Sequence, residues 1–166
     1  MIAYFLNSSA LVKRYIPETG SAWVRQLAPP QTGNELFIAR ITWVEVKSAI
    51  ARRQREGSLT STDRTLIVQR FRSDVNNQYQ VIELDSTLAE TAGQLVSQYP
   101  LRAYDAVQLA SVLLLQPAFA MTPSTQLIFL TDDNRLSTIA IAQGLLTDNP
   151  SWSLLGPSLY DTCLFR

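Results

Sequence analysis

Histidine is absent from the 166 residues of this sequence. Its absence excludes catalytic Ser-His-Asp and Cys-His arrangements, and it excludes zinc sites that use imidazole ligands. The six glycines form no phosphate-binding loop of the Gly-rich type. Any chemistry of this chain must therefore rest on carboxylates, hydroxyl groups, basic groups or a hard metal ion.

Cysteine, net charge and long apolar runs are also scarce. Cys163 is the sole cysteine, so no disulfide framework can form, and we expect a reducing cytoplasm. The 14 basic and 14 acidic residues cancel, so a nucleic acid would have to bind a local patch rather than a general positive field. The longest apolar region, 103–115, is interrupted by Asp105 and is too short for a membrane span.

Short apolar segments alternate with longer amphipathic ones along the chain. The segment 2–6 is apolar at almost every position, as in a strand with both faces buried. The predicted strands are 2–6, 36–41, 80–84, 126–130 and 145–147. The predicted helices are a short one after Asn7–Ser8 and those at 21–27, 42–56, 59–78, 86–99, 102–115 and 134–143. This alternation predicts an α/β fold with a parallel sheet between layers of helices.

The length of the chain suits a single domain with a substantial core. We predict one domain over 1–149 and a tail of unknown role over 150–166, where apolar residues show no clear period. Within the domain, 42–78 is predicted to form a helical hairpin whose turn begins at Gly57. One side of this hairpin is rich in arginine.

Asp105 is the most informative single residue of the sequence. It lies in an otherwise apolar helix and forms a narrow polar stripe with Gln108 and Ser111. A buried carboxylate is unfavourable unless it is paired or binds a cation. The alternative is a structural role, in which Asp105 complements the helix dipole or pairs with Arg102.

Three further carboxylates have structural explanations of their own. Thr42 and Glu45 fit a capping box, and Asp132 or Asp133 suits the cap of the following helix. Yet Glu45 follows the second predicted strand and Asp133 follows the fourth, as Asn7 follows the first. Because sites in open α/β sheets form at the carboxyl ends of strands, these groups are candidates for one Mg²⁺ or Mn²⁺ site.

Four segments resemble, in order, the motifs of PIN domains, and most closely those of VapC-type toxins of bacterial toxin–antitoxin pairs. The third segment is the most specific, and the resemblance covers about 1–149. The four segments are 5–15 (FLNSSALVKRY), 43–46 (WVEV), 101–110 (LRAYDAVQLA) and 131–136 (TDDNRL).

The resemblance implies a three-layer PIN-like fold with a central parallel sheet of four to five strands. It also implies a ribonuclease whose acidic residues hold Mg²⁺ or Mn²⁺. The positions that would be catalytic and metal-binding are Asn7, Glu45, Asp105 and Asp133, with Ser9 and Asp132 in support.

The same resemblance implies an RNA substrate, a cognate antitoxin and a homodimer. Arg52, Arg53 and Arg55 are the candidate contacts to the RNA backbone, with Lys13 and Arg14 as further candidates. The alternative for each of these residues is an ordinary solvated helix face.

Asn7 departs from the family pattern, which has aspartate at this position. Asparagine caps a helix about as well as aspartate, but it lacks the charge that draws Mg²⁺. The asparagine is either a natural loss or a substitution introduced to make a toxic protein tolerable. Two functions therefore remain open: an impaired ribonuclease toxin, or an inactive PIN-like module that binds an antitoxin or RNA without cleaving it.

Overall fold

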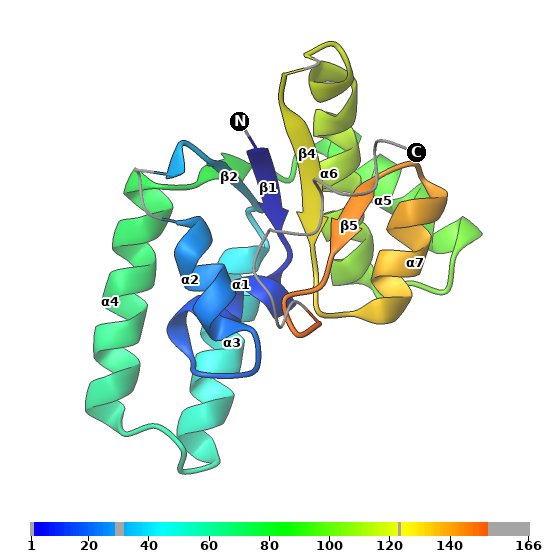
Figure 1. Ribbon diagram of the computed structural model, residues 1–166. Coiled ribbons are helices and arrows are strands. Elements are labelled where there is room, and N and C mark those ends of the chain that lie inside the picture. Colours follow the sequence, from blue (N-terminus) through cyan, green and yellow to red (C-terminus); the bar gives the residue numbers. More distant parts are fainter. Residues whose placement is uncertain (1, 29–31, 123, 153–166) are drawn as a thin grey trace.

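The computed structural model describes residues 2–28, 32–122 and 124–152, and Figure 1 shows their arrangement. Strands and helices alternate along most of the chain. The strands are β1 (Ile2–Leu6), β2 (Glu35–Ala39), β3 (Gln80–Ile82), β4 (Gln126–Leu130) and β5 (Leu146–Asp148). The helices are α1 (Ser8–Tyr15), α2 (Ser21–Leu27), α3 (Thr42–Arg55), α4 (Ser61–Asn77), α5 (Ser86–Gln98), α6 (Ala103–Ala120) and α7 (Asn134–Ala142).

All neighbouring strands are parallel, in the order β3-β2-β1-β4-β5, which confirms the predicted α/β fold. The central strand β1 pairs with β2 through Ala3 and Glu35, and with β4 through Ala3 and Leu127. From the central strand β1, the strands β2 and β3 follow on one side, and the order then reverses, with β4 and β5 on the other side. Such a reversal of strand order leaves a crevice at the carboxyl ends of the two strands beside it.

Strands β1 to β4 contribute alternate side chains to two separate apolar cores. Tyr4 and Leu6 of β1 pack with α1, α2, α3 and α4, whereas Ala3 and Phe5 pack with α5, α6 and α7. In Figure 1 the two sets of helices accordingly lie on opposite sides of the sheet. Burial on both faces explains why β1 carries no polar alternation.

The helical hairpin of α3 and α4 is closed by local signals. Gly57 has a φ of 79°, the left-handed conformation that glycine adopts readily after a helix end. A capping box then starts α4: the Asp63 amide donates to Thr60 Oγ1 at 3.1 Å, and the Thr60 amide donates to Asp63 Oδ2 at 3.0 Å. The hairpin extends away from the sheet in Figure 1.

Two predictions about helix ends were wrong. The capping box expected at Thr42 and Glu45 does not form, because Ile41 is the N-cap of α3 and makes no side-chain capping bond. Helix α6 continues past the predicted end to Ala120, with Pro117 inside it. In the part of the chain that the structure describes, no helix is long and apolar enough to cross a membrane.

A buried polar network joins α1 to α4. Arg14 Nη2 lies 3.3 Å from Asp74 Oδ2, and both side chains are less than one-tenth exposed. The Tyr15 hydroxyl donates to Asp74 Oδ2 at 2.8 Å, and Arg14 Nη1 donates to the Tyr79 hydroxyl at 2.6 Å. Burial is the main reason why the pKa of Tyr79 rises to about 12. Arg14 is therefore a structural residue, and the expectation that it contacts RNA is wrong.

We expect Asp74→Ala to lower the free energy of unfolding by about 3 kcal/mol, because it leaves the Arg14 guanidinium buried without its carboxylate. Urea unfolding followed by circular dichroism measures this change. The matched control is Asp63→Ala, the same substitution at an exposed position of the same helix, which should cost clearly less. Equal losses in the two variants would contradict a buried ion pair that holds α4 in place.

Candidate functional site

The candidate site lies where β1 and β4 end side by side. The Asn7 amide donates to the Leu130 carbonyl at 2.9 Å, so the residue after β1 is joined to the last residue of β4. Asn7 itself is buried, with 4% of its surface exposed. Helix α1 starts directly after Asn7, which is its N-cap, so of the two caps expected, Asn7 and Ser8, the structure has Asn7. Asp133 is the N-cap of α7.

The side chain of Asn7 has a fixed orientation. Its Oδ1 accepts hydrogen bonds from the Ser9 amide at 2.9 Å and from Ser9 Oγ at 2.8 Å. Since an N–H can only donate, the oxygen must face Ser9 and the NH₂ group must face the other way. An aspartate in this conformation would present a second carboxylate oxygen at the place where Asn7 presents donors.

Ser9 connects the two strand ends. Besides Asn7, Ser9 Oγ accepts from the Asp132 amide at 3.0 Å and lies 3.3 Å from Thr131 Oγ1. Its hydroxyl thus fixes the start of α1 against the turn that carries Asp132 and Asp133. This contact gives Ser9 a positioning role at the site.

Glu45 is held by residues far away in the sequence rather than by its own helix. Its Oε2 accepts from Ser8 Oγ at 2.9 Å and from Gln108 Nε2 at 2.7 Å. Burial raises the pKa of Glu45, and the negative charge of Asp105 raises it further, while the two hydrogen bonds oppose this change. Gln108 also donates to Thr42 Oγ1 at 2.8 Å, so the two residues of the expected capping box both bind α6.

Asp105 and Asp133 complete the group of acidic side chains. Burial, followed by the charge of Asp133, raises the pKa of Asp105, while Arg102 and Arg135 lower it. Arg135 Nη2 lies 3.8 Å from Asp105 Oδ2, at the limit of an ion pair. Asp133 caps α7 through Oδ1, which accepts from the Leu136 amide at 3.0 Å. We call Glu45, Asp105 and Asp133 the acidic cluster.

Comparisons with known proteins show the family of this chain. A family model described as "PIN domain" matches residues 4–142 of the chain. The chain belongs to the PIN domain family. It is 32% identical to "Ribonuclease VapC45" of Mycobacterium tuberculosis over 112 residues, which cover 68% of this chain and 75% of that protein. This PIN domain is therefore of the VapC type.

Solved structures share the fold of this PIN domain. FitAcB from Neisseria gonorrhoeae has a TM-score of 0.61 at 16% identity, covering 90% of this chain and 98% of that chain. VapBC2 from Rickettsia felis, bound to a DNA fragment from its promoter, has a TM-score of 0.56 at 15% identity, with the same coverage of both chains. At such low identity these two structures support the fold alone.

The donor types of the acidic cluster fit a hard divalent cation. Burial is the main cause of the raised pKa values of Glu45 and Asp105, with a smaller contribution from neighbouring carboxylates, and a bound cation would oppose both effects. Within residues 2–28, 32–122 and 124–152, however, no three acidic or cysteine side chains are close enough to hold one ion together. Mg²⁺ needs only one or two carboxylates and keeps several waters, so the cluster still suits it.

The predicted arginines lie apart from the acidic cluster, near the other end of α3. Arg53 forms an ion pair with Glu18, and Arg52 lies 3.9 Å from Glu56. Arg55 is exposed. Contacts of these three residues with RNA stay a prediction.

Lys13 is a residue whose role the sequence pattern did not indicate. Its ammonium group is almost fully buried and lies 2.9 Å from Asp132 Oδ2 and 3.6 Å from Glu18 Oε2. It also donates to the Thr19 carbonyl at 2.9 Å. The expectation that Lys13 contacts RNA is wrong, because it instead neutralises Asp132 beside the acidic cluster.

We expect Asp133→Asn to lower the pKa of Asp105, because the substitution removes a nearby negative charge while keeping a good helix cap. Carboxyl ¹³C chemical shifts followed against pH measure the effect. In the unsubstituted protein Asp105 should titrate above the usual range for aspartate. Asp132→Asn is the control, and an equal fall there would contradict a specific interaction between Asp105 and Asp133.

Proposed function

We propose that this PIN domain is a divalent-metal-dependent endoribonuclease, the toxin of a toxin–antitoxin pair, whose activity is impaired by Asn7. The observation that carries the proposal is the acidic cluster at the ends of β1 and β4, formed by three motifs that are distant in sequence. The charge of Asp133 raises the pKa of Asp105, and the charge of Asp105 raises the pKa of Glu45, as expected for three carboxylates that lie near one another. The similarity to a VapC ribonuclease supports the reaction type.

The acidic cluster has the groups that a phosphodiesterase of this kind needs. Mg²⁺ or Mn²⁺ held by one or two of the carboxylates of Glu45, Asp105 and Asp133, with water as the other ligands, would supply Lewis acidity toward the phosphodiester and acidify a water molecule. Ser8 and Gln108 orient the Glu45 carboxylate by donating to its Oε2. In a chain without histidine, proton transfer falls to water or to a carboxylate, and the raised pKa of Glu45 suits that task.

The partners follow from the same proposal. The substrate is RNA, and the toxin is held inactive by a cognate antitoxin. Structural relatives described as toxin–antitoxin assemblies support this partner, among them a toxin–antitoxin complex from Klebsiella pneumoniae. A homodimer is part of the proposal as well.

A second function is favoured by Asn7 itself. Its oxygen is occupied by Ser9, so its free end is an NH₂ donor, which cannot bind a cation. A PIN domain with this group could bind RNA or an antitoxin without cleaving RNA. The two functions differ in what restoring aspartate at residue 7 should do.

We expect Asn7→Asp to raise the rate of RNA cleavage by roughly 10- to 100-fold in Mg²⁺ or Mn²⁺, because it adds a carboxylate oxygen beside the acidic cluster. Denaturing gels of total RNA measure cleavage, and growth after induction measures toxicity. Asn7→Asp/Asp105→Asn is the control that should remain inactive. If Asn7→Asp neither cleaves RNA nor slows growth, the inactive binding module is the correct function.

Metal binding can be tested without any activity. Calorimetric titration with Mn²⁺ should show roughly tenfold or tighter binding for Asn7→Asp than for the unsubstituted protein. Asn7→Ser is the matched control, because serine also caps the helix but adds no carboxylate. If both variants bind Mn²⁺ more tightly, the higher affinity comes from a change at the start of helix α1 and not from a new carboxylate ligand.

A further inference from the structure

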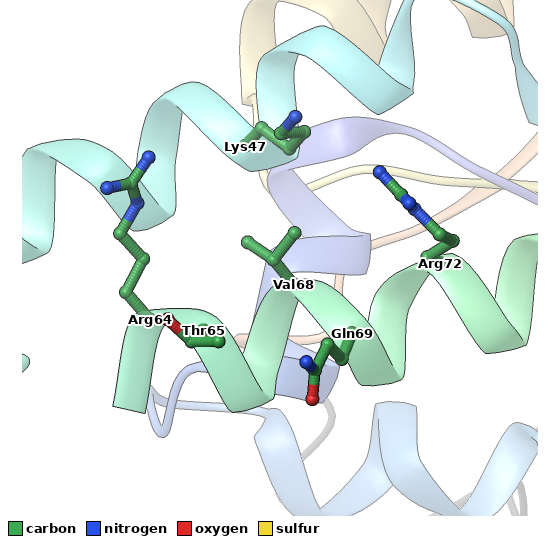
Figure 2. Close-up of a pocket in the computed structure, with 6 residues that line it drawn as sticks. All are labelled: Lys47, Arg64, Thr65, Val68, Gln69 and Arg72. Atoms are coloured by element: carbon green, nitrogen blue, oxygen red, sulfur yellow. The ribbon is translucent and has the colours of Figure 1, made fainter. Parts of the chain in front are cut away.

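A second polar site lies on the helical hairpin, apart from the acidic cluster. It is a cavity of about 330 Å³ between α3 and α4. Figure 2 shows the side chains that line it, with Lys47 on α3 facing Arg72 and Val68 on α4. We call this cavity the hairpin pocket; its lining residues are Lys47, Arg64, Thr65, Val68, Gln69 and Arg72.

Within the part of the chain that the structure describes, the three cations of the hairpin pocket have no acidic partner. Among the described residues, no carboxylate lies within ion-pair distance of any of them. Three acidic residues of the hairpin have other partners. Asp74 pairs with Arg14, Glu56 lies 3.9 Å from Arg52, and Asp63 belongs to the capping box of α4. The hairpin, 42–78, holds seven of the 14 basic residues but four of the 14 acidic ones. The hairpin pocket is thus an uncompensated positive site on a chain of zero net charge.

Trp43 holds two of these cations in place. Lys47 Nζ lies 5.1 Å from the centre of its ring, and Arg72 Cζ lies 5.7 Å from it. The ring in turn stacks on the buried Phe71, with centroids 5.1 Å apart and planes at 23°. Because Phe71 covers one face and two cations lie over the ring, Trp43 serves to hold the cations and is not a platform for a nucleobase.

The hairpin pocket and the acidic cluster flank the same helix. Glu45 and Lys47 are two residues apart on α3, which separates their directions by about 200° around the helix axis. Arg64 and Arg72 are separated by roughly 12 Å along α4, at 1.5 Å per residue. Lys47 therefore lies on nearly the opposite side of α3 from Glu45, and the cations of the hairpin pocket do not point into the acidic cluster.

We propose that the hairpin pocket binds the phosphodiester backbone of an RNA strand at nucleotides flanking the one in the acidic cluster. This proposal rests on the proposed function for its choice of RNA. Arginine guanidinium groups bind phosphate oxygens in a forked geometry, and Gln69 adds a neutral donor. Cations spaced along α4 match a polyanion with evenly repeated charge, and the lack of a stacking platform predicts binding that does not depend on base sequence.

The test uses the full chain with Asn7 in place, in EDTA, so that cleavage plays no part. Fluorescence anisotropy of a labelled short single-stranded RNA measures affinity against salt concentration. Arg72→Gln should weaken binding roughly fivefold at about 0.1 M salt, and Arg64→Gln/Arg72→Gln roughly 25-fold. The slope of log affinity against log salt should fall by about 0.7 for each contact removed.

Arg70→Gln is the matched control. Arg70 is exposed on the same helix, two residues from Arg72, and does not line the hairpin pocket. It should leave RNA affinity within about twofold, although it changes the net charge equally. Equal effects of Arg70→Gln and Arg72→Gln would overturn the proposal.

An acidic peptide is the competing ligand, and an oligoglutamate peptide is its probe. If Arg64→Gln/Arg72→Gln loses affinity for oligoglutamate while keeping its affinity for RNA, the hairpin pocket is a protein-binding site and the proposal is wrong. Failure here is distinct from failure of the proposed function, which is decided by cleavage with Asn7→Asp. Both arginines are exposed, so their substitution leaves the core intact.

Discussion

The burial of neighbouring carboxylates at the carboxyl edge of the sheet is the constraint on which this structure depends. Glu45 and Asp105 have raised pKa values because they are partly buried and close to other carboxylates. A carboxyl group with a raised pKa stabilises the fold below its unfolded pKa, and that stability is lost as pH rises through the folded pKa. Above these pKa values the charged Glu45 and Asp105 therefore work against folding until a cation or a donor compensates them.

The protein compensates these buried negative charges with neutral donors and with cations outside the cluster. Ser8 and Gln108 donate to Glu45, while Lys13 takes up the charge of Asp132. Asn7 acts in the same direction, since it keeps the cap of α1 while removing one negative charge from the edge of the sheet. Asn7 thus lowers the negative charge that the fold must accommodate without a metal ion, and for the same reason it weakens the binding of a metal ion.

Helix α3 separates two regions of opposite charge. Its first turn carries Glu45 toward α6, and the next residues carry Lys47 toward α4 and the hairpin pocket. The rigid stack of Trp43 on Phe71 connects the positive side to the core of the molecule. A polyanion that approaches the acidic cluster would be repelled there in the absence of a cation, so an attractive surface nearby gives it a place to bind.

The sequence by itself determined the parallel α/β fold and a helix cap at Asn7 or Ser8, because periodicity and helix caps depend on neighbouring residues, while the four segments of the site came from the resemblance to PIN domains. It did not determine the partners of Glu45, which come from 37 and 63 residues away, or the burial of Lys13. A capping box explained Glu45 equally well on paper. Only the packing of α3 against α1 and α6 decided between a capping box and hydrogen bonds to Ser8 and Gln108. A side chain binds the donors nearest in space, and tertiary structure alone brings these donors near.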